Sequence, residues 1–383
     1  MRLTPFALFA FLPLASLACS SASGSTDVGQ VSTKDSGVDT RAPVEEDAAI
    51  EEDTAPSDTG TIDTAPTTCE LRPKCDAAPP APGAKKGFRH SSTGFGGGAN
   101  HRGRDLFLKP GQKQWALAKF AYGAPTPDND AQDEDVDVYL LRDCGTEWKK
   151  IGTYRTTNDG AHSTEEGVVD SGGRIYLDLS AAEPVPLGVG RHRVHYVLTG
   201  DNSQADQYIE VLPEGAKVVV TDIDGTLTSS EKASWSEAFG GTPPDANAGA
   251  AAALGALARR GYYVFYLSAR PDFFVNKTRT WLEDKGFPRG ILHVSFSSIG
   301  ESGTAAIEFK TSELANLKTR TGVTPSYGFG NTDVDVTAYD NANIAPPANR
   351  YFFKYNTDLK GGTTHDDYSK LVSGFTALPT VCK

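Results

Sequence analysis

Residues 218–231 read VVVTDIDGTLTSSE and carry two carboxylates directly after a run of β-branched residues. Three valines and a threonine favour a strand that is buried on both faces. Asp222 and Asp224 follow at the end of that strand, where two like charges so close together repel each other. Gly225 then permits a tight turn. Two carboxylates that stabilise neither the strand nor the turn indicate a functional site.

The sequence after residue 213 alternates between strand and helix patterns. Buried-type strands are expected at 217–221, 262–268, 291–295 and 326–330, and helices at 248–260, 276–285 and 310–321. This alternation predicts βαβ units and an α/β, Rossmann-like domain with a parallel sheet. Reactive groups collect at the carboxyl ends of the strands in such sheets. Asp222, Ser268 and Asn331 are each expected at such an end.

The region from about 87 to 213 has a different rhythm, in which short strands are separated by turn residues. The expected strands are 115–122, 136–142, 149–154, 174–179, 191–199 and 208–212. Short, regularly spaced strands of this kind predict an all-β, immunoglobulin-like sandwich.

The two carboxylates of the motif suit phosphoryl transfer. Asp222 can accept a phosphoryl group at a loop where backbone N–H groups hold the phosphate oxygens. Asp224 can donate a proton to the leaving oxygen and later take one from water. Gly225 allows the turn beside the phosphate, Thr226 can hold Asp224 in place, and both are expected to be substrate-binding residues. Mg²⁺ would remove the repulsion between the carboxylates, because it prefers oxygen ligands and binds phosphate as well.

Phosphoryl transfer also needs a hydrogen-bond donor to the phosphate oxygens and a cation against the developing charge. The segment FYLSAR supplies Ser268 at a strand end, with Arg270 beside it as a substrate-binding residue. The segment EFKTSEL supplies Lys310 at the expected start of a helix. We therefore expect Ser268 and Lys310 to complete the catalytic set.

Further oxygen ligands for the metal are expected in the segment FGNTDVD. Asn331 ends the last expected strand, and Asp333 and Asp335 follow it. The predicted metal ligands are Asp222, Asp224, Asn331 and Asp335, with Asp333 as the alternative to Asp335.

The order Asp, Ser, Lys, Asn/Asp along the chain resembles that of the haloacid dehalogenase superfamily of phosphatases. DIDGTLTSSE is similar to the DIDGT-x-T-x-SD signature of lipins, although Glu231 stands where lipins usually have Asp. The segments YLSAR, FPRGILHVSFSS and FGNTDVDVTAY also resemble lipin segments. Lipins are Mg²⁺-dependent phosphatidate phosphatases. The resemblance therefore implies hydrolysis of phosphatidate to diacylglycerol through an aspartyl-phosphate intermediate.

The same lipin/Ned/Smp-type domain ends the retinal-degeneration-B-type phosphatidylinositol transfer proteins. There too a β-rich segment precedes it and ends in a phrase similar to VLPEGAKVVV, residues 211–220. In those animal proteins the first Asp of the motif is replaced, which implies binding of phosphatidate without hydrolysis. Asp222 is present here and favours an enzyme. A non-catalytic phosphatidate-binding or lipid-transfer module and a phosphatase for soluble periplasmic phosphoesters remain alternatives.

The N-terminus predicts export. Residues 1–18 contain Arg2, an apolar run and small residues before Cys19, as in a secretory signal peptide. The Ser-Leu-Ala before Cys19 resembles a bacterial lipobox, although Ser16 stands where Leu is usual. We expect lipid attachment at Cys19 and a location on a bacterial membrane, inner or outer, facing the periplasm or the cell surface. Ordinary secretion is the alternative.

Residues 20–68 predict a disordered tether. They contain eleven acidic residues against Lys34 and Arg41, which gives −9 of the chain's net charge of −12. A segment this polar cannot bury enough apolar surface to fold. The remainder of the chain is nearly balanced in charge, and nothing in it suggests a nucleic-acid partner. The expected organisation is a signal peptide (1–18), a lipidated Cys and linker (19–86), a β-sandwich (87–213) and a phosphatase domain (214–383).

Four further cysteines are expected to form disulfides, because the chain is predicted to be exported. They are Cys69, Cys75, Cys144 and Cys382, and they allow three connectivities. At least one bridge is expected to hold the C-terminal tail at Cys382 against the folded body.

The predicted phosphatase domain has no insertion large enough for a closed cap. Residues 227–250 hold only a short flap between the first strand and its helix. We therefore expect an open site that can accept a lipid headgroup. Trp235 and Phe239 of the flap either contact acyl chains or pack on the sheet.

Overall fold

The structure is a computed structural model that describes residues 68–90, 97–123, 129–230 and 242–383. The predicted signal peptide, Cys19 and nearly all of the tether lie outside these residues, as do Trp235 and Phe239. Within the described ranges, no helix combines the length and hydropathy that crossing a membrane requires. All of the described residues belong to one compact unit.

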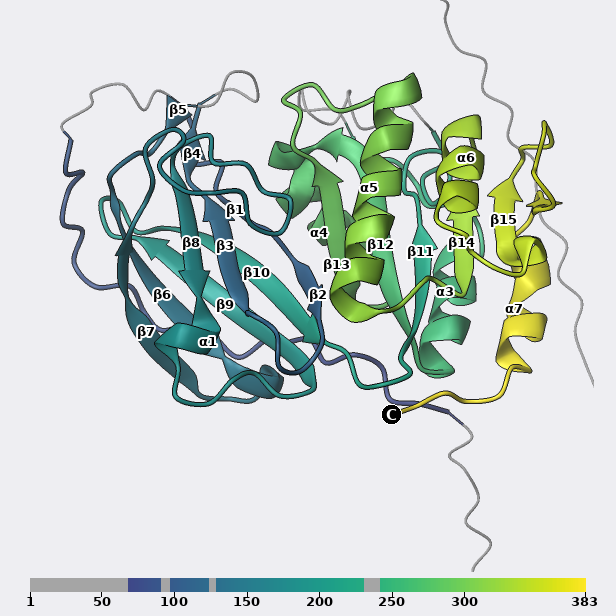
Figure 1. Cartoon of the computed structure of the whole chain (residues 1–383), viewed down its shortest axis with the longest axis horizontal. Helices are drawn as coiled ribbons and strands as arrows, with labels where there is room; N and C mark the ends of the chain where they lie inside the picture. The colour runs from purple at the N-terminus through teal and green to yellow at the C-terminus, as the bar shows by residue number, and fades with distance from the viewer. Residues whose placement is uncertain (1–67, 91–96, 124–128, 231–241) are drawn as a thin grey trace, which may run out of the picture. The chain divides into compact units, whose positions relative to one another are not determined.

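The first part of this unit contains two principal β-sheets (Figure 1). The antiparallel three-stranded sheet has the order β1 (Arg102–Gly103), β3 (Trp115–Lys119) and β8 (Arg174–Asp178). The five-stranded sheet has the order β2 (Leu106–Leu108), β10 (Ser203–Val211), β9 (Gly190–Leu198), β6 (Asp135–Leu141) and β7 (Trp148–Arg155). Smaller elements are the β4–β5 pair (Ala121–Tyr122 and Asn129–Asp130), η1 (Arg142–Cys144) and α1 (Leu179–Ala182).

Alternation along the strands builds the core of this β-sandwich. In β6, Val136, Val138 and Leu140 are fully buried, whereas the residues between them are half-exposed. Their side chains belong to one apolar cluster with Leu117 of β3 and Tyr196 of β9. Side chains that alternate between core and solvent are typical of a two-sheet sandwich. All six strands expected between 115 and 212 are present, and the predicted sandwich is confirmed.

The second part is an α/β domain around a parallel six-stranded sheet (Figure 1). Its strand order is β13 (Gly290–Ser295), β12 (Tyr262–Pro271), β11 (Lys217–Thr221), β14 (Tyr327–Gly330), β15 (Arg350–Phe353) and β16 (Thr363–His365). Its helices are α3 (Ala250–Arg259), α4 (Val275–Asp284), α5 (Gly303–Thr321), α6 (Asp333–Asn341) and α7 (Ser369–Thr376), with short turns η2 (Asp272–Phe274) and η3 (Pro347–Asn349). The predicted Rossmann-like sheet is confirmed.

The valines of the opening motif are buried because helices cover both faces of this sheet. Val219 packs in the cluster that contains residues of α3, α4 and α7. Val218 and Val220 point the other way and pack with residues of α5 and α6. A strand that is covered on both sides has no solvent-exposed face, so its sequence is a continuous run of apolar residues. β11 lies inside the sheet, between β12 and β14.

One helix differs from the expectation in its start. α5 begins at Gly303 rather than at Lys310, so Lys310 lies inside the helix and not at its start. Of the residues before Lys310 in this helix, only Ala306 is buried. Because these first two turns face mostly solvent, they carry no apolar stripe that sequence patterning can detect.

Two disulfides select one of the three possible connectivities. Cys69 pairs with Cys382, and Cys75 pairs with Cys144. The first bridge holds the C-terminal tail to the body, as predicted. It sits beside Gly261, whose φ of +96° follows the end of α3. A Cβ at Gly261 would lie 3.0 Å from the sulfur of Cys69 and 2.9 Å from the backbone N of Cys382, so the bridge packs on a bare backbone.

We predict that replacing Cys69 and Cys382 by Ser lowers the free energy of unfolding by about 3–5 kcal/mol, because the bridge closes a long loop in the unfolded chain. The Cys75→Ser/Cys144→Ser double variant is the matched control. Its bridge spans 69 residues rather than 313, and loop entropy alone makes its loss about 1 kcal/mol smaller. Denaturant titration of both variants measures the two losses. Equal stability of the wild type and the Cys69/Cys382 variant would contradict the prediction.

Candidate functional site

A pocket of about 310 Å³ opens at the carboxyl ends of the parallel strands. Asp222 and Asp224 follow β11, Arg270 is the last residue but one of β12, and Asn331 follows β14. Lys310 reaches the same pocket from α5. Residues predicted from four separate segments of the sequence therefore line one cavity.

Asp222 and Lys310 form a buried ion pair at the base of this pocket. The Nζ of Lys310 donates to Oδ1 of Asp222 at 2.7 Å, and the hydroxyl of Thr226 lies 3.0 Å from Oδ2. Burial raises the pKa of Asp222 to about 7; Lys310 opposes this shift, and the charges of Asp335 and Asp224 add to it. Asp222 also lines the cavity where a phosphate can enter.

Asp335 lies behind Lys310 and does not line the pocket. Its Oδ1 accepts from Lys310 Nζ at 2.6 Å, and its Oδ2 accepts from the backbone N–H groups of Asn331 and Thr332. With Thr332 it also forms the capping box that starts α6. Asp333 instead lines the pocket. The assignment of Asp335 as a metal ligand stays a prediction, and its present contacts support Lys310 and the helix start.

Asp224 is held by a buried arginine. Nε and Nη2 of Arg270 donate to the two oxygens of Asp224 at 2.8 and 2.9 Å, and Nη1 donates to Thr278 on α4. The hydroxyl of Ser268 also donates to Asp224, at 3.0 Å. Ser268 is fully buried and does not line the pocket, so in this structure it orients Asp224.

The turn after the two aspartates is fixed by contacts that the sequence motif did not reveal. Gly225 adopts a φ of +69°, which favours glycine, and its N–H donates to the hydroxyl of Thr228. The Nδ2 of Asn247 lies within hydrogen-bond distance of three carbonyl oxygens of this turn. The hydroxyl of Tyr368, 142 residues away in sequence, donates to the carbonyl of Thr226.

Thr226 itself is fully buried and lies between two site residues. Its hydroxyl oxygen is 3.0 Å from Oδ2 of Asp222 and 2.8 Å from Oδ1 of Asn331. It was expected to hold Asp224, and instead it contacts Asp222. Neither Thr226 nor Gly225 lines the pocket, so both shape the turn around Asp222.

The far wall of the pocket is the segment between β13 and α5. Ile299, Gly300, Glu301 and Ser302 line it, together with Gly303 at the start of α5. The Ile299 side chain is 67% exposed. These residues were not predictable from the sequence, because they lie in a loop without a motif. Within the described residues, no cap domain covers the pocket.

The donors around the pocket suit a hard divalent cation. Asp222, Asp224 and Asp333 contribute carboxylate oxygens, and Asn331 contributes an amide oxygen. All are oxygen ligands, the class that Mg²⁺ prefers over nitrogen and sulfur. The residues present therefore match the predicted cofactor in donor type, although among the described residues no three His, Cys, Asp or Glu side chains are gathered as a metal site.

Comparisons with known proteins match both folded parts of the chain. Residues 99–211 match the family described as "PITM 1-3, beta-sandwich domain", and residues 219–353 match "PITM 1-3, LNS2 domain". Protein retinal degeneration B of Drosophila melanogaster is 30% identical over 283 residues, which cover 73% of this chain and 20% of that protein. Human membrane-associated phosphatidylinositol transfer protein 2 is 27% identical over 249 residues, which cover 65% of this chain and 16% of that protein.

Among solved structures, a phospho-aspartyl intermediate analogue of phosphoserine phosphatase is matched at 16% identity and a TM-score of 0.30, over 42% of this chain and 98% of that chain. This likeness is too distant to support an argument about activity. The matched part of this chain spans about a fifth or less of the two relatives named above. The chain contains the β-sandwich and LNS2 domains of the PITM 1-3 family and is homologous to retinal degeneration B and the membrane-associated phosphatidylinositol transfer proteins.

Proposed function

We propose that the α/β domain is a phosphatase that hydrolyses a phosphate monoester through an aspartyl-phosphate on Asp222, with phosphatidate as the substrate. The observation that carries the proposal is the pairing of Asp222 with Lys310 at 2.7 Å in the same pocket as Asp224 and Arg270. A nucleophilic carboxylate, a buried cation and a second carboxylate are the groups that this reaction needs.

In the first step an oxygen of Asp222 attacks the phosphorus atom, and the bond from phosphorus to the leaving alkoxide oxygen breaks. Asp224, in its protonated form, gives its proton to that oxygen. In the second step a water oxygen attacks the phosphorus of the aspartyl-phosphate. Asp224 takes the proton from this water, and Asp222 and inorganic phosphate are released. Mg²⁺ bound by the oxygen donors of the pocket would supply positive charge between carboxylate and phosphate.

The protein's own groups do the remaining work. Lys310 offsets negative charge at Asp222 and is itself held by Asp335. Arg270 donates hydrogen bonds to both oxygens of Asp224. When Asp224 takes up a proton, the hydrogen bond to the protonated oxygen must break or lengthen. Burial lowers the pKa of Lys310, but the charges of Asp222 and Asp335 outweigh burial and raise it above its usual value. Lys310 therefore acts as a permanent cation and not as a base.

A non-catalytic phosphatidate-binding module is the alternative from another class. A binder needs positive charge for the phosphate and has no use for a carboxylate at the centre of the pocket. Asp222 lies there and lines the cavity beside Lys310. This placement favours the enzyme.

The choice of phosphatidate rests on the rim of the pocket and on the relatives. Ile299 is a large apolar side chain that is exposed at the rim, where an acyl chain or membrane surface can contact it. The human relative described above is named as a membrane-associated phosphatidylinositol transfer protein. A phosphatase of soluble phosphoesters remains the competing candidate.

We predict that Asp222→Asn lowers kcat for phosphate release by about 10³-fold or more, because an amide cannot form the acyl-phosphate. Asp245→Asn is the matched control, since Asp245 is an exposed carboxylate of the same domain that pairs with Lys285. It is expected to keep full activity. A chelator is expected to abolish phosphate release by the wild type, and added Mg²⁺ is expected to restore it. An Asp222→Asn protein with a tenth of wild-type activity would exclude the mechanism.

We predict that phosphatidate in mixed micelles is hydrolysed with a kcat/KM at least about tenfold above that for glycerol 3-phosphate, because the open rim can meet a lipid surface. Ile299→Ser separates the two substrate classes. It is expected to lower kcat/KM for phosphatidate and to leave that for glycerol 3-phosphate unchanged. If glycerol 3-phosphate is the better substrate, the lipid assignment fails while the phosphatase assignment stands.

We also propose that the protein is attached to a bacterial membrane by a lipid on Cys19. This proposal rests on the sequence alone, because Cys19 lies outside the described residues. We predict that Cys19→Ala abolishes incorporation of a labelled fatty acid and releases the protein from the membrane fraction, since one lipid-modified residue then no longer holds it. Ser20→Ala is the control and keeps both. Unchanged labelling of the Cys19→Ala protein would rule the anchor out.

A further inference from the structure

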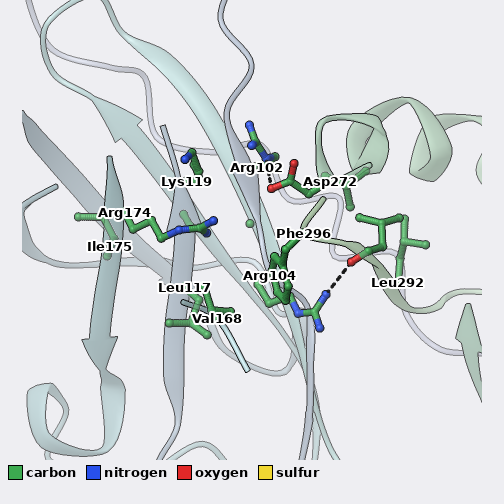
Figure 2. A pocket seen from close by; sticks show the side chains of 14 residues that line it. Arg102, Arg104, Leu117, Lys119, Val168, Arg174, Ile175, Asp272, Leu292 and Phe296 are labelled. Carbon is green, nitrogen blue, oxygen red and sulfur yellow. Dashed lines mark hydrogen bonds and ion pairs between the residues drawn. The ribbon is translucent and has the colours of Figure 1, made fainter. Parts of the chain in front are cut away.

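Four cationic side chains surround a small cavity between the β-sandwich and the parallel sheet domain (Figure 2). They are Arg102 of β1, Arg104 just after it, Lys119 of β3 and Arg174 of β8, and each is less than 9% exposed. The cavity holds about 30 Å³. It lies apart from the phosphatase pocket, which none of these four residues lines.

Three of the four cations have a carboxylate partner. Arg102 pairs with Asp272 at 2.8 Å, Arg104 with Glu313 at 2.7 Å, and Lys119 with Asp130 at 2.8 Å. Each of these three cations is therefore paired with a carboxylate, whereas, in the residues that the structure describes, the fourth cation, Arg174, is not.

Arg174 is a buried cation without an ion pair among the described residues. Its Nε donates to the hydroxyl of Ser171 at 3.3 Å, and its guanidinium carbon lies 6.0 Å from the centre of the Phe296 ring. The side chain is 92% buried, and Figure 2 shows its guanidinium pointing into the cavity toward Phe296. Burial lowers the pKa of Arg174; the charge of Asp272 opposes this shift, and the neighbouring Arg102 adds to it.

Arg104 supplies a second buried donor without an acceptor. Its Nε is buried and has no hydrogen-bond partner in the described part of the chain. The guanidinium carbon lies 4.5 Å from the centre of the Phe296 ring. Burial and the charge of Arg104 also lower the pKa of the nearby Arg320 to about 10. The positive charge around the cavity therefore exceeds what the carboxylates there offset.

The size and lining of the cavity limit what can compensate this charge. A buried charge without a partner is strongly unfavourable, and an anion beside it removes that penalty. About 30 Å³ admits roughly two water-sized spheres. Leu117, Val168, Ile175, Val275 and Leu292 give the rest of the wall an apolar character. A small, singly charged ion fits this space, and a bulky organic anion does not.

We propose that this cavity binds one small inorganic anion of the size of chloride or bromide, held between Arg174 and Arg104, and that the ion fastens the β-sandwich to the α/β domain. The inference does not depend on the phosphatase activity. The ion would be a structural ligand, because the cavity is separate from the pocket that contains Asp222.

The test is thermal unfolding of the whole chain in mixtures of sodium chloride and sodium gluconate at constant ionic strength. Replacing gluconate by chloride is expected to raise Tm by about 3–6 °C with saturation, because the ion binds only the folded state. Arg174→Gln is expected to lose this dependence. Arg142→Gln is the matched control, since Arg142 lies in the same sandwich, pairs with Glu183 and does not line the cavity.

A chloride effect that does not saturate, or one that Arg174→Gln retains, would overturn the proposal. If Arg174→Gln fails to fold, crystals of the wild type grown in bromide decide the matter. An anomalous-scattering peak between Arg174 and Arg104 is expected there. Its absence at a bromide concentration that saturates the Tm shift would also overturn the proposal.

Discussion

The site depends on one buried cation held between two carboxylates. Lys310 contacts Asp222 at 2.7 Å and Asp335 at 2.6 Å, and all three side chains are buried. One ammonium facing two carboxylates leaves a formal surplus of one negative charge. That surplus, with the burial, explains why the pKa of Asp222 is raised despite its direct contact with Lys310. A site built this way favours a further cation in the pocket, and the oxygen donors beside Asp222 are suited to hold one.

The two aspartates of the motif have different environments, although one residue separates them. Asp222 faces the cavity beside an ammonium group, whereas Asp224 is gripped at both oxygens by Arg270. Arg270 reaches Asp224 because the pairing of β12 with β13 shifts its register between Ser268 and Pro271. Such a bulge re-aims side chains at the end of a strand. Different roles for the two carboxylates therefore follow from the shape of the neighbouring strand.

The central strands were predictable from the sequence, because local patterns determine them. So were five residues of the pocket: Asp222, Asp224, Arg270, Lys310 and Asn331. The valine run placed β11, and parallel-strand geometry then brought Asp222 and Asn331 to one edge. The contacts of Tyr368 and Asn247 with the motif turn were not predictable, since they join residues far apart along the chain. The role of Asp335 was equally hidden. The spacing of the motif predicts that the carboxylate of Asp335 lies near the site. It does not predict which groups form hydrogen bonds with its oxygens.

The β-sandwich contributes to the site through the helix that carries Lys310. Glu313 lies three residues further along α5, on the same side of the helix, and both side chains are buried. Glu313 accepts from Arg104 of the sandwich at 2.7 Å and lies 2.5 Å from Nδ1 of His293 on β13. Burial opposes its ionisation, but Arg104 and His293 outweigh burial and lower the pKa of Glu313 to about 2. Arg104 of the sandwich thus holds α5 at Glu313, and Asp222 holds it at Lys310, so the position of Lys310 depends on both domains.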